Sequence, residues 1–239
     1  MIFVKAAAAA VLLASAVHAD MTSYPEPLAD ALAMTYEAPE EAHWRYVMQV
    51  TMNDASMQVR FDGSQPDGEQ WQLVAPASED GLADILVDVW QDLNQPDAED
   101  ENAGDGISIN ATEGLFFSSD TADVVAGDVV STGTNRFTFR PDLGSDEEDD
   151  AMRSFMTGEL SLAPAGHVDQ IRVFAPESFK PHVAARVHAF EMVIRFDRIE
   201  GLPAPIMTSL STEIDISAMF QRQQQAVRFE FSDVEYVEP

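Results

Sequence analysis

The chain has 239 residues, no cysteine, and 42 Asp and Glu against 13 Lys and Arg, a formal net charge of −29 at pH 7. The lack of cysteine excludes disulfides, thiol catalysis and cysteine-ligated metal sites. The negative charge excludes a nucleic-acid-binding surface, because such a protein repels phosphates and anionic lipid headgroups. The charge is consistent with simple solubility, or with binding of a basic partner or divalent cations.

The first 19 residues have the pattern of a secretory signal peptide. Lys5 precedes the apolar residues 6–17, and Val17-His18-Ala19 fits the small-residue cleavage rule. The apolar run is too short to cross a membrane, and no other stretch is long enough, so no transmembrane segment is expected. Cleavage after Ala19 predicts a periplasmic protein, with residues 20–239 forming a single domain.

Two helices are predicted in the first half of the chain. Residues 25–37 place Leu28, Leu32 and Tyr36 on one face. Residues 78–94 have Ser78 as a plausible N-cap and acidic residues in the first turn. The second helix has one apolar stripe, formed by Leu82, Ile85, Leu86, Val89, Trp90 and Leu93, and one acidic face, formed by Asp84, Asp88 and Asp92.

Residues 43–75 predict three antiparallel strands with one apolar and one polar face each. In the first strand Trp44, Tyr46, Met48, Val50 and Met52 alternate with polar residues, with Val47 as the only exception. A turn at Asn53-Asp54 leads to a second strand with Met57, Val59 and Phe61 on one face. The third strand has Trp71, Leu73 and Ala75 on one face. A sheet with a single apolar face has to curl, meet another sheet, or be covered by helices.

Residues 107–131 are less regular, with short valine-rich strands broken by Gly114 and Gly127. Alternation returns in six later segments, marked by Phe137 and Phe139, by Met152, Met156, Leu160 and Leu162, by Ile171 and Val173, by Phe190 to Phe196, by Leu210 to Ile216, and by Val227 to Phe231. The chain is therefore predicted to be mainly β, a curved antiparallel half-barrel of about nine to eleven strands covered by two helices.

No metal or cofactor site is predicted. The acidic residues 95–106 match the calcium-binding EF-hand loop in neither possible register, although a non-standard calcium site stays open, and residues 145–150 have no fixed ligand spacing. Besides His18, the histidines are His43, His167, His182 and His188, which are expected at the surface or at strand edges because two of them without a third ligand make a poor metal site.

Several segments resemble a family of exported, uncharacterised proteobacterial proteins. They are VRFDGSQPDGEQWQLV, GELSL, VDQIRVFAPESFKP, VHAFEMVIRF and AVRFEFSDVEYV. An RFDPxxPxGxRWxLL-like motif of that family is matched by Arg60, Phe61, Asp62, Pro66, Gly68, Trp71 and Leu73, and a later APxPFxP-like motif by Ala175, Pro176, Phe179 and Pro181. The layout is also similar to periplasmic lipoprotein carriers of the LolA/LolB type, which implies a half-barrel with a helical lid over a hydrophobic cavity. Fold alone does not imply function.

The leading hypothesis is a periplasmic, non-enzymatic protein that binds acyl chains or a lipidated partner. The candidate ligand-binding residues are Trp44, Tyr46, Met48, Met52, Trp71, Leu86, Trp90, Phe190 and Met192. Flexible methionines and large aromatic residues suit a surface that accepts apolar ligands, but they also fill ordinary cores. The alternative is an interaction or sensor module that binds a basic protein partner through its acidic surface or a sheet edge, without lipid. No catalytic motif is found, so an enzyme is not expected.

Overall fold

The structure, a computed structural model, describes residues 24–37, 42–66, 68–94, 115–141, 154–182, 185–218 and 221–237. The predicted signal peptide, the acidic residues 95–106 and 145–150, and Ile107, Ile109 and Met152 lie outside the described residues.

The described chain is mainly β. Its strands are β1 (His43–Met52), β2 (Ala55–Asp62), β3 (Trp71–Ala75), β4 (Val125–Gly133), β5 (Arg136–Pro141), β6 (Thr157–Leu162), β7 (Val168–Phe174), β8 (Phe179–His182), β9 (Ala185–Asp197), β10 (Ile206–Ala218) and β11 (Gln221–Val237). Its α-helices are α1 (Glu26–Leu32), α2 (Asp84–Asn94) and α3 (Ser119–Asp123), with a 3-10 turn at Glu79–Gly81.

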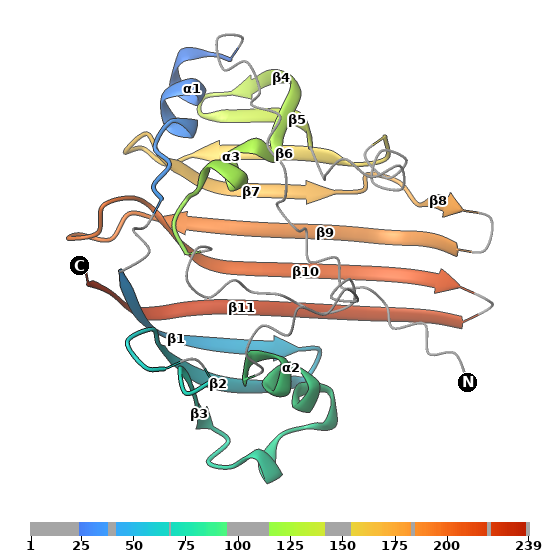
Figure 1. The fold of residues 1–239 in the computed structure, drawn as a ribbon. Helices are drawn as coiled ribbons and strands as arrows, with labels where there is room; N and C mark the ends of the chain where they lie inside the picture. Colours follow the sequence, from blue (N-terminus) through green and yellow to red (C-terminus); the bar gives the residue numbers. More distant parts are fainter. Residues whose placement is uncertain are drawn as a thin grey trace.

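All eleven described strands belong to one antiparallel sheet in the order β3-β2-β1-β11-β10-β9-β7-β6-β5-β4, with β8 paired to β9 beside this path. β3 and β4 form the two edges and do not pair with each other, so the sheet is open and half-barrel-like (Figure 1). The prediction of a mainly β, antiparallel half-barrel is confirmed. The long strands β9, β10 and β11 cross its middle.

One face of the sheet, the inner face, carries the apolar side chains. β1 alternates strictly, with Trp44 and Met48 buried and Arg45 exposed, as its sequence predicts. The same alternation is confirmed in β2, β6, β7 and β9. Because side chains turn over at every strand residue, the charged residues of these strands fall on the opposite, outer face.

Two hydrophobic clusters cover different parts of the inner face. The α1 cluster joins Leu28, Ala31 and Leu32 to the inner faces of β5, β6, β7 and β9. The α2 cluster joins Leu86 and Trp90 to those of β1, β2 and β11. The two helices therefore cover opposite halves of the sheet (Figure 1).

Both predicted helices are shorter than the sequence pattern indicates. α1 ends at Leu32, and the chain then leaves the helix because Tyr36 N donates to Phe117 O at 3.0 Å. The prediction that Ser78 caps a helix reaching Asn94 is wrong, because Ser78 precedes only the 3-10 turn and Leu82 is extended. Ile85 was predicted to face the core but is 40% exposed.

Helix α3 was not predicted from the sequence. It is five residues long, and the side chain of Ser118 caps it by accepting a hydrogen bond from Thr121 N at 3.2 Å. Thr121 is buried. This short helix forms where a Ser cap and tertiary burial act together, without the long apolar period that identifies a helix in a sequence.

Charge is distributed unevenly between the strands and the rest of the chain. The eleven strands hold ten of the 13 Lys and Arg residues but only eleven of the 42 Asp and Glu residues. The strands therefore carry a net charge of −1, and the remainder of the chain carries −28. The eleven described strands are thus nearly neutral, and most of the acidic residues belong to other parts of the sequence.

Candidate functional site

The inner face has a row of half-buried apolar side chains along β10. Leu210, Ile214 and Ile216, which we name the central seam, point to the same face and lie between the two clusters. Leu210 packs against both clusters, whereas Ile214 and Ile216 border the α1 cluster. From Leu210 to Ile216 the seam is about 20 Å long, at ~3.3 Å per strand residue.

Residues 115–117, which we name the strap, lie along the start of β10, beyond the Leu210 end of the seam. The strap backbone is bonded there at both of its ends, because Met207 N donates to Leu115 O at 2.6 Å and Phe117 N donates to Pro205 O at 2.9 Å. Phe116 also forms an isolated β-bridge with Ile206, at the start of β10. All three strap side chains are buried.

The structure divides the nine predicted ligand-binding residues between the two clusters. Seven belong to or border the α2 cluster, namely Trp44, Tyr46, Met48, Met52, Trp71, Leu86 and Trp90, whereas Phe190 and Met192 belong to the α1 cluster. All are buried except Trp71, which is half-buried. These residues pack within the two clusters on either side of the seam, and residues that only fill the core would do the same.

The seam residues are not among the ligand-binding residues that the sequence predicts. Their alternation on β10 identified an inner face, but their partial exposure depends on how far α1 and α2 extend over the sheet. The signal that could have singled them out is the composition of β10, where Leu210, Ile214 and Ile216 are separated by small polar or acidic residues.

An aromatic group lies beside the strap. Trp44 contacts Phe116 and Tyr236, with ring centroids 4.4 and 4.8 Å apart, and the Tyr36 ring lies 4.7 Å from that of Phe116. The hydroxyls of Tyr36 and Tyr236 are hydrogen-bonded at 2.8 Å. Trp44 Nε1 is buried, and no residue in the described ranges accepts its hydrogen.

Burial also affects the neighbouring tyrosine of β1. Tyr46 is 1% exposed, and its desolvation raises the pKa of its phenol well above the usual range, because the charged phenolate would lose its hydration. Tyr46 therefore stays neutral in the folded protein.

The outer face carries polar networks rather than an apolar site. Arg172 donates to Glu159 at 3.0 Å and to Glu191 at 2.5 Å. Asp215 accepts two hydrogen bonds from Arg222 and one from Gln224. These bonds, led by those from Arg222, lower the pKa of Asp215 well below its usual range.

A serine–histidine pair lies in the second of these networks. His188 Nε2 is 2.9 Å from Ser217 Oγ, and His188 lies where the β9–β10 register shifts. A hydrolytic site would need a carboxylate to orient the histidine ring, but the carboxylate of Asp215 is occupied by Arg222 and Gln224. The pair is best described as a hydrogen bond between neighbouring strands.

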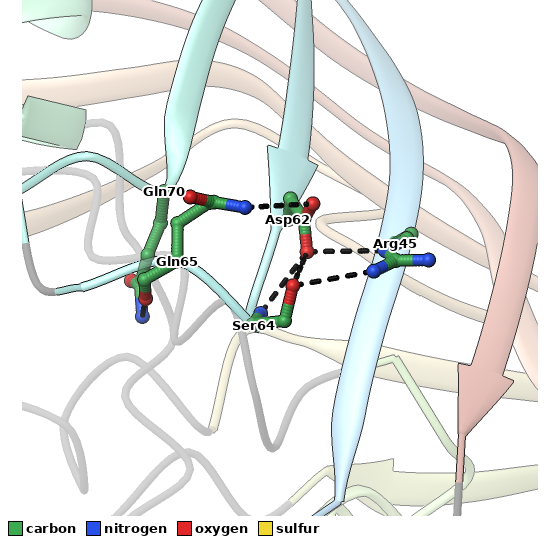
Figure 2. Close-up of polar contacts among 5 residues, drawn as sticks. All are labelled: Arg45, Asp62, Ser64, Gln65 and Gln70. Atoms are coloured by element: carbon green, nitrogen blue, oxygen red, sulfur yellow. Dashed lines mark hydrogen bonds and ion pairs between the residues drawn. The ribbon is translucent and has the colours of Figure 1, made fainter.

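The aspartate of the RFD motif, Asp62, is the centre of a hydrogen-bond network at the end of β2, which we name the polar hub (Figure 2). Asp62 accepts hydrogen bonds from the hydroxyl and backbone N of Ser64, from Arg45 Nε at 3.1 Å and from Gln65 Nε2 at 3.4 Å. These bonds, led by that of the Ser64 hydroxyl, lower the pKa of Asp62 well below its usual range. The hub orders the β2–β3 connection, so this motif has a structural role.

The expectation that the histidines lie at the surface is wrong for His167. Its side chain is 4% exposed in the turn between β6 and β7, where its carbonyl accepts from Ala163 N at 2.9 Å. His43, by contrast, is exposed on β1.

Within the described ranges, no three His, Asp or Glu side chains come together as metal ligands would. Among the helices described, none has the length and apolar character needed to cross a membrane.

Comparison of the chain with protein-family models, with curated proteins and with solved structures found no match.

Proposed function

We propose that this chain is a periplasmic, non-enzymatic binding protein that takes up acyl chains, free or attached to a lipidated partner, along the inner face of its sheet. The observation that carries the proposal is the central seam, where an open sheet leaves three apolar side chains half-buried between two covered halves.

The shape of the seam suits a long, thin apolar ligand. A row of side chains on one strand offers a narrow path about 20 Å long, bordered by the α1 cluster on one side and by the α2 cluster at Leu210. An acyl chain in this path would gain about 0.8 kcal/mol for each CH₂ group removed from water. Binding would thus come from apolar area, which requires no catalytic group.

Native mass spectrometry of the protein purified from periplasm tests the proposal. We expect a stoichiometric adduct with the mass of an acyl lipid, which solvent extraction then releases for identification. A bare polypeptide mass, together with no uptake of a fluorescent fatty acid by the extracted protein, would contradict the proposal.

Two variants distinguish binding at the seam from nonspecific binding of the fatty acid. Ile214→Glu places a charge among the seam side chains and should abolish uptake, because burying an unpaired carboxylate is costly. Val193→Glu is a matched control, because Val193 is half-buried on the adjacent strand but lies on the outer face, opposite Ser211. Equal loss of uptake in both variants would show that the seam is not the site.

A second candidate function follows from the charge distribution. Because the residues outside the described strands carry a net charge of −28, a basic protein could bind them without contacting the seam. This interaction module predicts salt-sensitive binding to a basic partner that is unchanged in Ile214→Glu.

A further inference from the structure

The strongest unexplained feature outside the seam is the indole N–H of Trp44. The residue is 1% exposed, and no acceptor among the residues that the structure describes is within hydrogen-bond distance of Nε1. Buried donors in native proteins nearly always have a partner, since leaving one unpaired is costly. A buried donor without a partner calls for an explanation, and a ligand atom that accepts its hydrogen is one such explanation.

The surroundings of Trp44 restrict the chemistry of the missing acceptor. The contacting rings are those of Phe116 on the strap and Tyr236 on β11, at 4.4 and 4.8 Å. An anion at this depth would lose its hydration among aromatic rings and would be strongly disfavoured. A neutral carbonyl oxygen satisfies the donor without that cost.

The position of Trp44 connects it to the seam. Phe116, whose ring covers Trp44, forms the β-bridge with Ile206, and Ile206 precedes the seam residue Leu210 on β10. Of the two rings that contact Trp44, that of Tyr236 belongs to the sheet and that of Phe116 to the strap. A ligand whose head extends past Leu210 along the inner face meets the strap at Phe116, and this ring would have to move for the head to contact Trp44.

We propose that Trp44 Nε1 donates a hydrogen bond to a neutral carbonyl oxygen at the head of the ligand, so that the protein selects acyl esters or amides over plain hydrocarbons. This inference rests on the proposed function, because it assumes that an apolar chain occupies the seam. It adds the chemical class of the ligand and the end of the seam at which its head lies.

The test compares two probes of the same chain length, methyl palmitate and hexadecane, by competition with a bound fluorescent fatty acid. The wild type should prefer the ester, and Trp44→Phe, which keeps an aromatic ring but removes the donor, should reduce ester affinity about three- to tenfold. Hexadecane affinity should stay unchanged. Phe61→Leu, in the same cluster but without a ring contact to Trp44, is the control and should leave the ester preference intact.

A second measurement does not depend on the stability of a variant. The chain has three tryptophans, hence three indole N–H signals in a nitrogen-15 NMR spectrum. The Trp44 signal should move downfield with methyl palmitate but not with hexadecane, because only the ester offers a strong acceptor.

The outcomes distinguish the two proposals. Two results would contradict the carbonyl inference but not the binding function. One is that both probes bind and Trp44→Phe lowers the affinity for both equally. The other is that methyl palmitate does not shift the Trp44 indole signal. If neither probe binds, both proposals fall. Tighter binding of palmitate anion than of its methyl ester would replace the neutral carbonyl by a carboxylate and overturn the inference.

Discussion

Glu191 of β9 and Glu213 of β10 are directly opposite each other in the sheet. Arg172 binds Glu191 and Glu159 from the neighbouring strand β7, whereas Glu213 is exposed. Like charges placed directly opposite on a sheet repel, so Arg172 compensates a repulsion that the strand pairing imposes.

Glu213→Gln should therefore stabilise the protein by about 0.2–1 kcal/mol, because it removes the repulsion and breaks no observed ion pair. Glu191→Gln should have the opposite effect, because it removes the same repulsion but also an ion pair with Arg172. Urea unfolding at low and high salt measures both. An equal gain in stability for the two variants would show that the Arg172 ion pair contributes nothing.

Adjacent residues of α2 should differ sharply in their contribution to stability. Leu86 is fully buried in the α2 cluster, so Leu86→Ala should lower the free energy of unfolding by about 2–5 kcal/mol. Ile85 is 40% exposed, so Ile85→Ala should change it by less than about 0.5 kcal/mol. Urea titration of both variants checks the prediction. A large decrease in the free energy of unfolding for Ile85→Ala would contradict this and would show that Ile85 packs in the apolar face, as the sequence pattern indicates.

A glycine of β6 provides space for an aromatic ring. A Cβ atom at Gly158 would collide with the ring of Phe139 on β5, whereas one at Gly133 on β4 would meet no atom within 4 Å. Gly158→Ala should therefore destabilise the protein by about 1–3 kcal/mol, and Gly133→Ala should have little effect.

The Phe139→Leu change tests the mechanism of this clash. In the double variant with Gly158→Ala, the smaller side chain should recover part of the loss, which a double-mutant cycle of unfolding free energies measures. Strict additivity of the two single changes would contradict a direct collision between these residues.

The ion pair between Asp215 and Arg222 should make stability depend on pH. Because the pKa of Asp215 is lowered in the folded state, its contribution is fully present above the unfolded-state value of about 3.9 and is lost as the pH falls through the lower, folded value. The difference in Tm between the wild type and Asp215→Asn should therefore be largest near neutral pH and should shrink in strong acid.

Thermal unfolding monitored by circular dichroism over that pH range measures the difference. Glu69→Gln, which changes an exposed carboxylate in the β2–β3 connection, is the control and should show no such loss in acid. A Tm difference for Asp215→Asn that is constant with pH would contradict the prediction.

Strand alternation is the reason that the sheet could be predicted. Trp44, Met48, Val59 and Phe190 lie on inner faces as their sequence positions indicate, because a period of two leaves little choice once one face is buried. The starts and ends of the helices were less predictable, since Leu82 and Tyr36 leave the helical conformation for tertiary contacts.

The seam and the strap could not be derived from the sequence. The partial burial of Ile214 depends on how α1 and α2 divide the inner face, and the strap is held by backbone bonds to Pro205 and Met207, which are far away along the chain. Both features arise from long-range packing, which leaves no local period in the sequence.

β11, the last strand in the sequence, lies between β1 and β10 and so connects the two parts of the sheet. β1, β2 and β3 join the other strands of the sheet only through the pairing of β1 with β11, which links residues nearly the full length of the chain apart. During synthesis, the early hairpin has no sheet to join until the C-terminal strand emerges, and contacts of such high sequence separation form slowly. Loss of the C-terminal strand would divide the sheet into two fragments, each with a newly exposed edge open to aggregation.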